Sequence, residues 1–282
     1  MDFLSAESLD EALARLTELG DEAQVLAGGT DVMIQHRLRQ IDPSTFLYIG
    51  RLDSLRRLDA NGHVTIGPMI SHKTLGADPV IGSELPALAE AARTVGSWQT
   101  QEVGTIGGNV CNASPAADTV PPLLVANAIV ELSSQNGNRL LPLDEFLVVR
   151  RTNDRAPSER LTAFEADPVP VGAGGSYGRR GRRSAMEVSI VGLAARMTFG
   201  PAGEVSSARI AVCSVAPRPY RATEAERILQ GDQLDPDRIA EAGHGSHHGI
   251  ITAAERMRWG WQQRQRHWRR CRYHLPGGQS GL

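Results

Sequence analysis

Apolar positions near the N-terminus follow a helical period. Apolar side chains recur every three to four residues between Leu9 and Leu19, which predicts an amphipathic helix over residues 7–19 with Ser5 as its cap. A short apolar run over residues 24–27 then predicts a strand that ends at two glycines. Apolar positions from Val32 onward predict another helix. The order is therefore strand, glycine loop, helix.

The rest of the chain mixes the two periodicities without a regular repeat. Strands are predicted over residues 45–49 and 64–66, with Asn61-Gly62 as a turn, and a helix over residues 85–95. Later apolar runs over residues 187–199 and 206–215 favour strands, or a strand and a short helix, and a helix follows over 222–229. This mixture indicates an α+β arrangement rather than a long parallel series.

A change in composition divides the chain. Prolines and glycines crowd residues 167–175 and disfavour both helix and strand pairing, which places a domain boundary there, between residues 1–168 and 172–282. The stretch after Gly249 is atypical, because seven arginines and three of the four tryptophans lie within residues 256–282. We interpret this break as a frame shift near residues 246–249, with a basic arm that docks onto a partner or nucleic acid as the alternative.

Composition and charge exclude several classes of protein. Of the 282 residues 41% are hydrophobic and 22% charged, which is typical of a globular protein, and a formal net charge of −2 disfavours a nucleic-acid binder. The cysteines, Cys111, Cys213 and Cys271, are too scattered to ligate a cluster or form a disulfide set. No apolar stretch is long enough to span a membrane and no signal peptide is evident, so we expect a cytoplasmic location.

The first glycine segment, residues 27–31, has the sequence Ala-Gly-Gly-Thr-Asp. Glycines between a strand and a helix let backbone amides approach a phosphate closely, so an anion site is physically reasonable. A plain turn is the structural alternative. The segment is neither G-x-G-x-x-G nor a Walker sequence, which disfavours a Rossmann or P-loop site.

A second segment, residues 104–118, combines glycines with short polar side chains. Asn109, Asn112 and Ser114 offer hydrogen bonds, and Asp118 could accept one from a sugar hydroxyl. A tight polar turn whose asparagines bond to their own backbone is the alternative. Two such segments in one chain favour the two phosphates of a dinucleotide.

Together these segments resemble the FAD-binding medium subunit of the molybdenum hydroxylases, the family of xanthine dehydrogenase and carbon monoxide dehydrogenase. The matching residues are 27–31, 105–109 and 112–118. Ser71-His72 resembles the family's Thr-His segment, and residues 177–187 resemble its stretch from Tyr-x-Lys to Arg-x-Ala-Met-Asp. The resemblance covers roughly residues 1–245.

The resemblance implies a vanillyl-alcohol-oxidase-type (PCMH-type) FAD-binding fold of two subdomains, about residues 1–52 and 53–168, followed by a smaller α+β domain built on a three-stranded sheet with helices. FAD would lie extended between the two subdomains. The residues implied to bind it are Gln24, Val25, Leu26, Ala27, Gly28, Gly29, Thr30, Asp31, Val32, Ser71, Thr105, Ile106, Gly107, Gly108, Asn109, Ser114, Asp118, Leu161 and Arg179. Two positions depart from the pattern: Arg179 replaces a lysine and Glu187 an aspartate, and a guanidinium need not preserve a lysine's contact.

No catalytic carboxylate pair, nucleophile or metal signature is visible, so we expect the chemistry to be the cofactor's. The resemblance implies a heterotrimer, in which a small subunit carries [2Fe–2S] clusters and a large subunit carries molybdopterin. Two heterotrimers would pair, and FAD on this chain would pass electrons to an external acceptor. A flavin-free scaffold subunit and a self-sufficient flavin oxidase are the alternatives.

Five charged or titratable residues invite a catalytic or metal-binding reading that we do not adopt. Asp31 precedes a predicted helix, so we expect it to cap that helix rather than to act as a base. We expect His72 to pack or to contact the cofactor. His244 lies near His247 and His248, but without an acidic or cysteine partner these three histidines are expected to be solvated.

Overall fold

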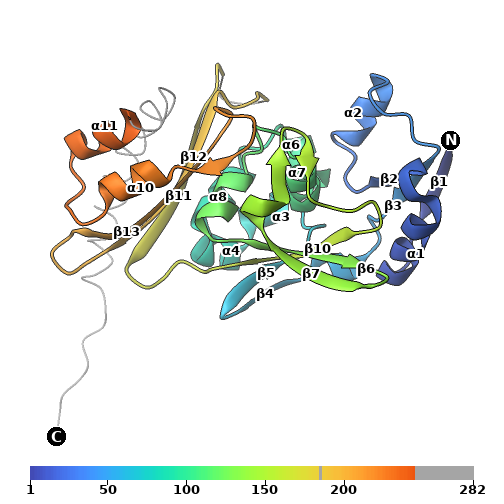
Figure 1. The fold of residues 1–282 in the computed structure, drawn as a ribbon, viewed down its shortest axis with the longest axis horizontal. Helices are drawn as coiled ribbons and strands as arrows, with labels where there is room; N and C mark the ends of the chain where they lie inside the picture. The colour runs from blue at the N-terminus through green and yellow to red at the C-terminus, as the bar shows by residue number, and fades with distance from the viewer. Residues whose placement is uncertain (184–185, 245–282) are drawn as a thin grey trace, which may run out of the picture.

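Three larger β-sheets follow one another along the molecule (Figure 1). The computed structural model describes residues 1–183 and 186–244. Helices and strands are mixed in each part, which confirms the predicted α+β class. The predicted features of the tail after Gly249, as well as His247 and His248, lie outside the described residues.

The first subdomain is a small parallel sheet with helices, in the strand order β1-β3-β2. Helix α1 begins at Leu9 because the Oγ of Ser8 accepts a hydrogen bond from the Glu11 amide at 3.1 Å. The predicted cap, Ser5, is wrong, since it is the last residue of a strand. The elements are β1 (Asp2–Ser5), α1 (Leu9–Leu19), η1 (Gly20–Glu22), β2 (Ala23–Leu26), α2 (Val32–Arg37) and β3 (Thr45–Tyr48).

The second subdomain surrounds an antiparallel sheet in the order β4-β5-β10-β6-β7. Phe164 on its central strand is fully buried, and the predicted turn at Gly62 has the positive φ of 84° that the β4-β5 hairpin requires. The elements are η2 (Asp53–Arg56), β4 (Leu58–Asn61), β5 (His63–Ile66), α3 (His72–Ala77), α4 (Pro79–Glu84), α5 (Pro86–Ala92), α6 (Trp98–Val103), α7 (Ile106–Cys111), α8 (Val120–Val125), β6 (Ile129–Ser134), β7 (Gly137–Pro142), α9 (Leu143–Phe146), β8 (Leu147–Val149), β9 (Thr152–Asn153) and β10 (Arg160–Ala166).

The C-terminal part is a sheet in the order β11-β12-β13-β14, flanked by two helices. Three of its strands are long, as expected, but a short fourth strand pairs with β13, so the expectation of three strands is corrected to four. The elements are β11 (Ala173–Arg180), β12 (Val191–Phe199), β13 (Val205–Cys213), β14 (Tyr220–Arg221), α10 (Thr223–Leu229) and α11 (Pro236–His244).

The linker predicted over residues 167–175 is held against both of its neighbours. The Arg196 guanidinium donates to the Asp167 carbonyl at 2.8 Å, and the Val169 amide donates to the Glu84 carbonyl at 2.8 Å. Ala194 and Ala211 of the C-terminal sheet are fully buried in the hydrophobic core that fills the second subdomain. The two sides of the proposed boundary therefore share a core, and the position of the boundary itself stays a prediction.

Candidate functional site

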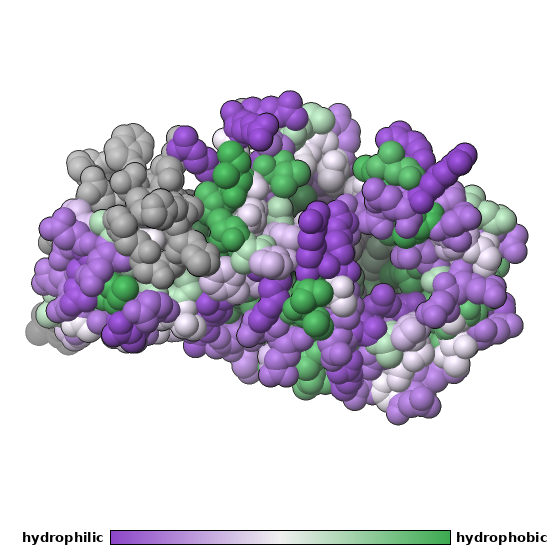
Figure 2. All heavy atoms as spheres, turned by 45° about the horizontal axis from the view of Figure 1, so that its top comes forward, coloured by the Kyte–Doolittle hydropathy of each residue, from purple (hydrophilic) through white to green (hydrophobic). Residues whose placement is uncertain are grey.

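A cleft of about 770 Å³ separates the first subdomain from the second. Figure 2 shows the surface hollowed where the first subdomain faces the middle of the molecule. The structure brings both glycine segments to this cleft, although they lie far apart in sequence. All the predicted site residues line it except Leu26, Ser71, Ile106 and Arg179.

The first glycine segment presents unpaired backbone amides to the cleft. The amides from Gly28 to Val32 donate no hydrogen bond to any acceptor among residues 1–183 and 186–244, whereas the next amide, that of Met33, donates to the Gly29 carbonyl at 3.1 Å. Successive free N–H groups in a concave segment form an anion-binding site. This geometry is what the sequence prediction of an anion site requires.

The glycines of this segment are needed for packing against the protein as well as for exposing the backbone amides to a ligand. A Cβ on Gly28 would lie 1.8 Å from the Val103 carbonyl oxygen, so the segment can approach α6 only without a side chain. Gly29 has a φ of +71°, which L side chains rarely adopt. Both positions therefore require glycine even without a ligand.

The second segment is a helix start rather than the expected loop. Thr105 caps α7, and its Oγ1 accepts from the Gly108 amide at 3.1 Å. The amides of Ile106 and Gly107 donate to the carbonyls of Ile70 and Pro68 at 3.1 and 2.9 Å. These two amides are therefore already bonded within the protein, and the implied contact of residues 105–109 with the cofactor stays a prediction.

The second segment faces the cleft with the open side of Gly108 and the side-chain amide of Asn109. A Cβ on Gly108 would meet only the Thr105 hydroxyl, at 3.1 Å, whereas a Cβ on Gly107 would lie 2.5 Å from the Pro68 side chain. Thr119 donates to Asn109 Oδ1 at 2.7 Å, which leaves the Nδ2 group of Asn109 without a partner among the described residues. Gly108 and Asn109 are thus the residues through which α7 can contact a ligand.

The four predicted residues that do not line the cleft have structural explanations. Leu26 ends β2, and Ile106 is the first residue of α7 and is fully buried. Ser71 caps α3, because its Oγ accepts from the Thr74 amide at 3.2 Å. Arg179 reaches the cleft wall indirectly, through Asp118. Their roles in binding stay predictions.

Asp118 sits in a buried hydrogen-bond network that joins the second subdomain to the C-terminal sheet. Its Oδ1 accepts from the hydroxyls of Tyr177 and Ser189, each at 2.5 Å, and Arg179 lies 3.4 Å from Oδ2. Burial raises the pKa of Asp118, and these three partners oppose the rise. Tyr177, Ser189 and Arg179 therefore compete with the expected sugar hydroxyl for the Asp118 carboxylate, although Asp118 still lines the cleft.

Asp31 and Ser114 both line the cleft. Asp31 occupies the N-cap position of α2 but its side chain caps no amide, so the expected capping hydrogen bond is absent from this helix start. Ser114 Oγ accepts from the Ala116 amide at 3.3 Å and lines the cleft. Neither residue has a base or nucleophile beside it in the described structure.

His72 lies between the two glycine segments and is buried. Its amide donates to the Gly104 carbonyl at 3.0 Å, and its Nδ1 has no partner among the described residues. Burial lowers the pKa of His72 from 6.5 to about 4, so the imidazole is neutral at pH 7. A neutral ring in the cleft wall agrees with the expected packing or cofactor-contact role, and not with a proton donor.

We predict that His72 makes the fold sensitive to acid. A group whose pKa is lowered on folding stabilises the protein fully above pH 6.5 and loses that contribution as the pH falls toward 4. The loss amounts to about 3 kcal/mol of unfolding free energy. Urea unfolding of the wild type and of His72→Leu at pH 7.0 and about pH 4.5 measures it. The variant should lose less stability than the wild type over this interval, and equal losses would contradict the assignment.

Several cleft residues were missed by the sequence prediction. They come from the turn before α6, from the strand region before β10 and from the segment before β12, and they are Val95, Gly96, Ser97, Arg151, Asn153, Arg155, Arg160, Met186, Glu187 and Val188. Each group reaches the cleft through contacts distant in sequence. The crowding of arginines over residues 150–160 and the family resemblance of residues 177–187 are the signals that a sequence reading could have used.

Comparisons with known proteins agree with this geometry. Residues 1–166 match the model of the FAD binding domain in molybdopterin dehydrogenase, and residues 177–257 match that of the CO dehydrogenase flavoprotein C-terminal domain. The chain belongs to this family of flavoprotein subunits. It is thus a subunit of an oxidoreductase, and residues 1–166 form its FAD-binding domain.

Individual relatives of the family cover most of the chain. The alpha subunit of the 6-hydroxypseudooxynicotine dehydrogenase complex of Paenarthrobacter nicotinovorans is 32% identical over 250 residues, 88% of this chain and 84% of that one. The putative xanthine dehydrogenase FAD-binding subunit of Escherichia coli is 33% identical over 233 residues, 82% of this chain and 79% of the relative.

A solved structure has the same architecture. Carbon monoxide dehydrogenase from Hydrogenophaga pseudoflava superposes with a TM-score of 0.83 at 29% identity, over 87% of this chain and 85% of that one. The predicted PCMH-type fold with a C-terminal domain is therefore confirmed. In the described residues no helix is long and apolar enough to cross a membrane.

Proposed function

We propose that this chain holds one noncovalent FAD in the cleft and transfers electrons within a molybdenum hydroxylase. Electrons would arrive from [2Fe–2S] clusters on a small subunit and leave to an external acceptor, while a large subunit hydroxylates the substrate at a molybdopterin centre. The observation that carries this proposal is the run of unpaired amides from Gly28 to Val32, which faces the cleft in a chain of this family.

The residues of the cleft suit FAD in charge and shape. The free amides from Gly28 to Val32 would donate to the pyrophosphate, and the Nδ2 group of Asn109 could add a donor from the opposite wall. The open face of Gly108 leaves room for the cofactor. When bound, FAD supplies one- and two-electron chemistry, and the chain's part is to bind, orient and shield it.

Exposed apolar side chains around the cleft support a partner subunit that covers it. Ile34, Met186 and Val188 all line the cleft, yet they remain 48%, 64% and 73% exposed. Apolar side chains gathered beside a cofactor site are typical of a protein–protein contact. The small and large subunits, their pairing into a dimer of heterotrimers, and a cytoplasmic location all belong to this proposal.

Purification of the tagged chain with its neighbouring gene products tests the proposal. We expect a complex that contains flavin, iron and molybdenum, with about one FAD per copy of this chain, whose flavin band bleaches on addition of the substrate of the complex. The isolated chain should keep its FAD but show no reduction by that substrate. A flavin-free complex would favour the scaffold alternative, and flavin reduction by a small alcohol without partners would favour the oxidase.

A further inference from the structure

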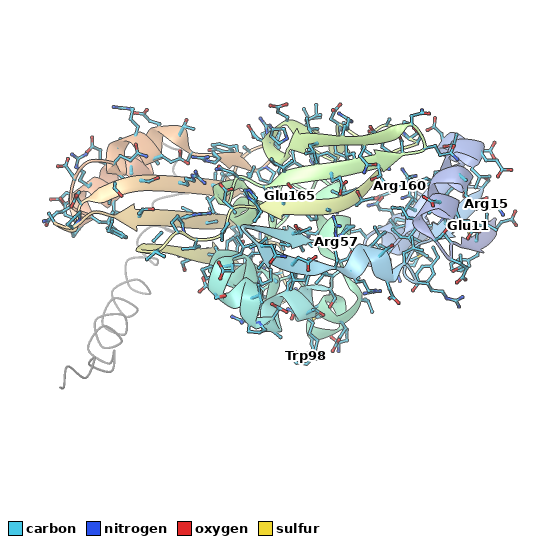
Figure 3. The ribbon with its side chains drawn as sticks, turned by 90° about the horizontal axis from the view of Figure 1, so that it is seen from below. Glu11, Arg15, Arg57, Trp98, Arg160 and Glu165 are labelled. Carbon is cyan, nitrogen blue, oxygen red and sulfur yellow. The ribbon has the colours of Figure 1, made fainter. Side chains whose placement is uncertain are left out.

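Two arginines, Arg155 and Arg160, line one wall of the cleft without a carboxylate partner. Arg160 begins β10 at the end of this strand that lies toward the first subdomain (Figure 3), and it is only 8% exposed. Among residues 1–183 and 186–244 no aspartate or glutamate lies within ion-pair distance of either guanidinium, whereas Arg57, Arg139 and Arg179 each have one. A buried cation, Arg160, beside a half-buried one, Arg155, with no carboxylate within ion-pair distance in this part of the chain, needs an explanation.

The hydrogen bonds of these guanidinium groups are incomplete. Arg155 donates from one terminal nitrogen to the Glu159 carbonyl at 3.2 Å, and Arg160 donates to the carbonyls of Pro157, at 2.8 Å, and of Glu159. The Nε atoms of both arginines are buried and have no partner among the described residues. Buried donors are nearly always paired, so an acceptor from outside this part of the chain is expected.

The titratable groups nearest to the pair do not neutralise it. Cys111 lies close enough for the two arginines to affect its thiol, but burial outweighs them and raises the pKa, which keeps the thiol neutral. The Glu159 carboxylate is bound by the Arg139 guanidinium at 2.7 and 2.9 Å and by the Ala156 amide at 2.8 Å, and the charge of Arg155 adds only the last of the effects that lower its pKa. Burial, and after it the charge of Arg155, lower the pKa of Arg160 to about 9, the direction expected for a buried cation with no carboxylate beside it.

We propose that Arg155 and Arg160 bind a phosphate-class oxyanion at the Cys111 end of the cleft. Guanidinium groups bind phosphate oxygens with strong, charge-assisted hydrogen bonds, and such an anion would supply the counter-charge that the two arginines lack. Cys111 is the last residue of α7 and Gly107 lies in its first turn, so about 6 Å of helix separates this position from Gly107. The two arginines and the amides of Gly28–Val32 come from different segments that line the same cleft, so the position of this site relative to the cofactor rests on the proposed function.

Titration of the purified protein with inorganic phosphate tests the site. In chloride buffer at constant ionic strength, we expect a saturable rise in the melting temperature and broadening of the ³¹P resonance. Arg160→Met and Arg155→Met keep the aliphatic stem and should each weaken phosphate binding about tenfold or more. Arg15→Met removes an exposed arginine of α1 that pairs with Glu18, and it should leave binding unchanged. Flavin absorbance in the same samples reports FAD binding separately.

The source of the oxyanion follows from a second titration with phenyl phosphate. Tighter binding of phenyl phosphate identifies the ligand as a phosphate ester, and tighter binding of inorganic phosphate identifies it as the free ion. A non-saturable response, or the same response in both arginine variants as in the wild type, overturns the site. Circular dichroism of each variant shows that it is folded, and Arg155→Met, whose position is less buried, keeps the test decisive if Arg160→Met unfolds.

Discussion

Gly108→Leu should lower the affinity for FAD by about 100-fold or more while leaving the chain folded. A Cβ at this helical position meets only the Thr105 hydroxyl, so the new side chain extends into the space that the cofactor would occupy. The helix itself gains from the change, because leucine favours helix more than glycine does. The ratio of flavin to protein after purification, and a fluorescence titration of the flavin-free chain with FAD, measure the effect.

Two further glycine variants control for helix propensity and for packing. Gly82→Leu makes the same change in α4, at an exposed position where a Cβ meets nothing within 4 Å, and it should retain FAD fully. Gly107→Ala adds a single methyl group 2.5 Å from Pro68, so we expect it to destabilise the fold itself. If Gly108→Leu bound FAD as well as Gly82→Leu does, the cofactor would not lie against α7.

The glycine pattern predicted both of the segments that line the cleft. Its physical basis, free backbone amides that face a ligand, holds for only one of them. Local sequence shows that residues 28–32 follow a strand and precede a helix, and the free amides of that segment follow from this local geometry. The Gly107 amide, by contrast, donates to the carbonyl of Pro68, which lies in a segment distant in sequence. A pattern of glycines cannot distinguish an amide that faces a ligand from one that faces the protein.

The polar residues of the site show the same limit. Asp118 was expected to face a sugar hydroxyl, yet its partners Tyr177 and Ser189 lie 59 and 71 residues further along the chain. Arg155 and Arg160 were not predicted at all, because the neighbouring sequence does not show whether an arginine side chain is buried or exposed. Burial of polar groups is set by tertiary packing, which the periodicity of apolar positions does not encode.

Asp118→Ala should lower the unfolding free energy by about 3 kcal/mol at pH 7, because it leaves the Arg179 guanidinium and the hydroxyls of Tyr177 and Ser189 buried without their acceptor. The pH dependence has a definite sign. A carboxyl whose pKa is raised on folding stabilises the protein most below its ordinary pKa of 3.8, and this contribution falls as the pH rises through the raised value. The difference between wild type and variant should therefore be larger near pH 4 than at pH 8.

Chemical denaturation of both proteins across this pH range measures the difference. Asp144→Ala is the matched control, because Asp144 pairs with Arg218 at 2.9 Å on the surface, where 57% of its side chain is exposed. Such an exposed pair contributes about 1 kcal/mol or less, so its loss should be small at every pH. Equal effects of the two substitutions would mean that the Asp118 network does not join the second subdomain to the C-terminal sheet. A selective effect of Asp118→Ala would show that this carboxylate, which lines the cofactor cleft, also fixes the C-terminal sheet against it.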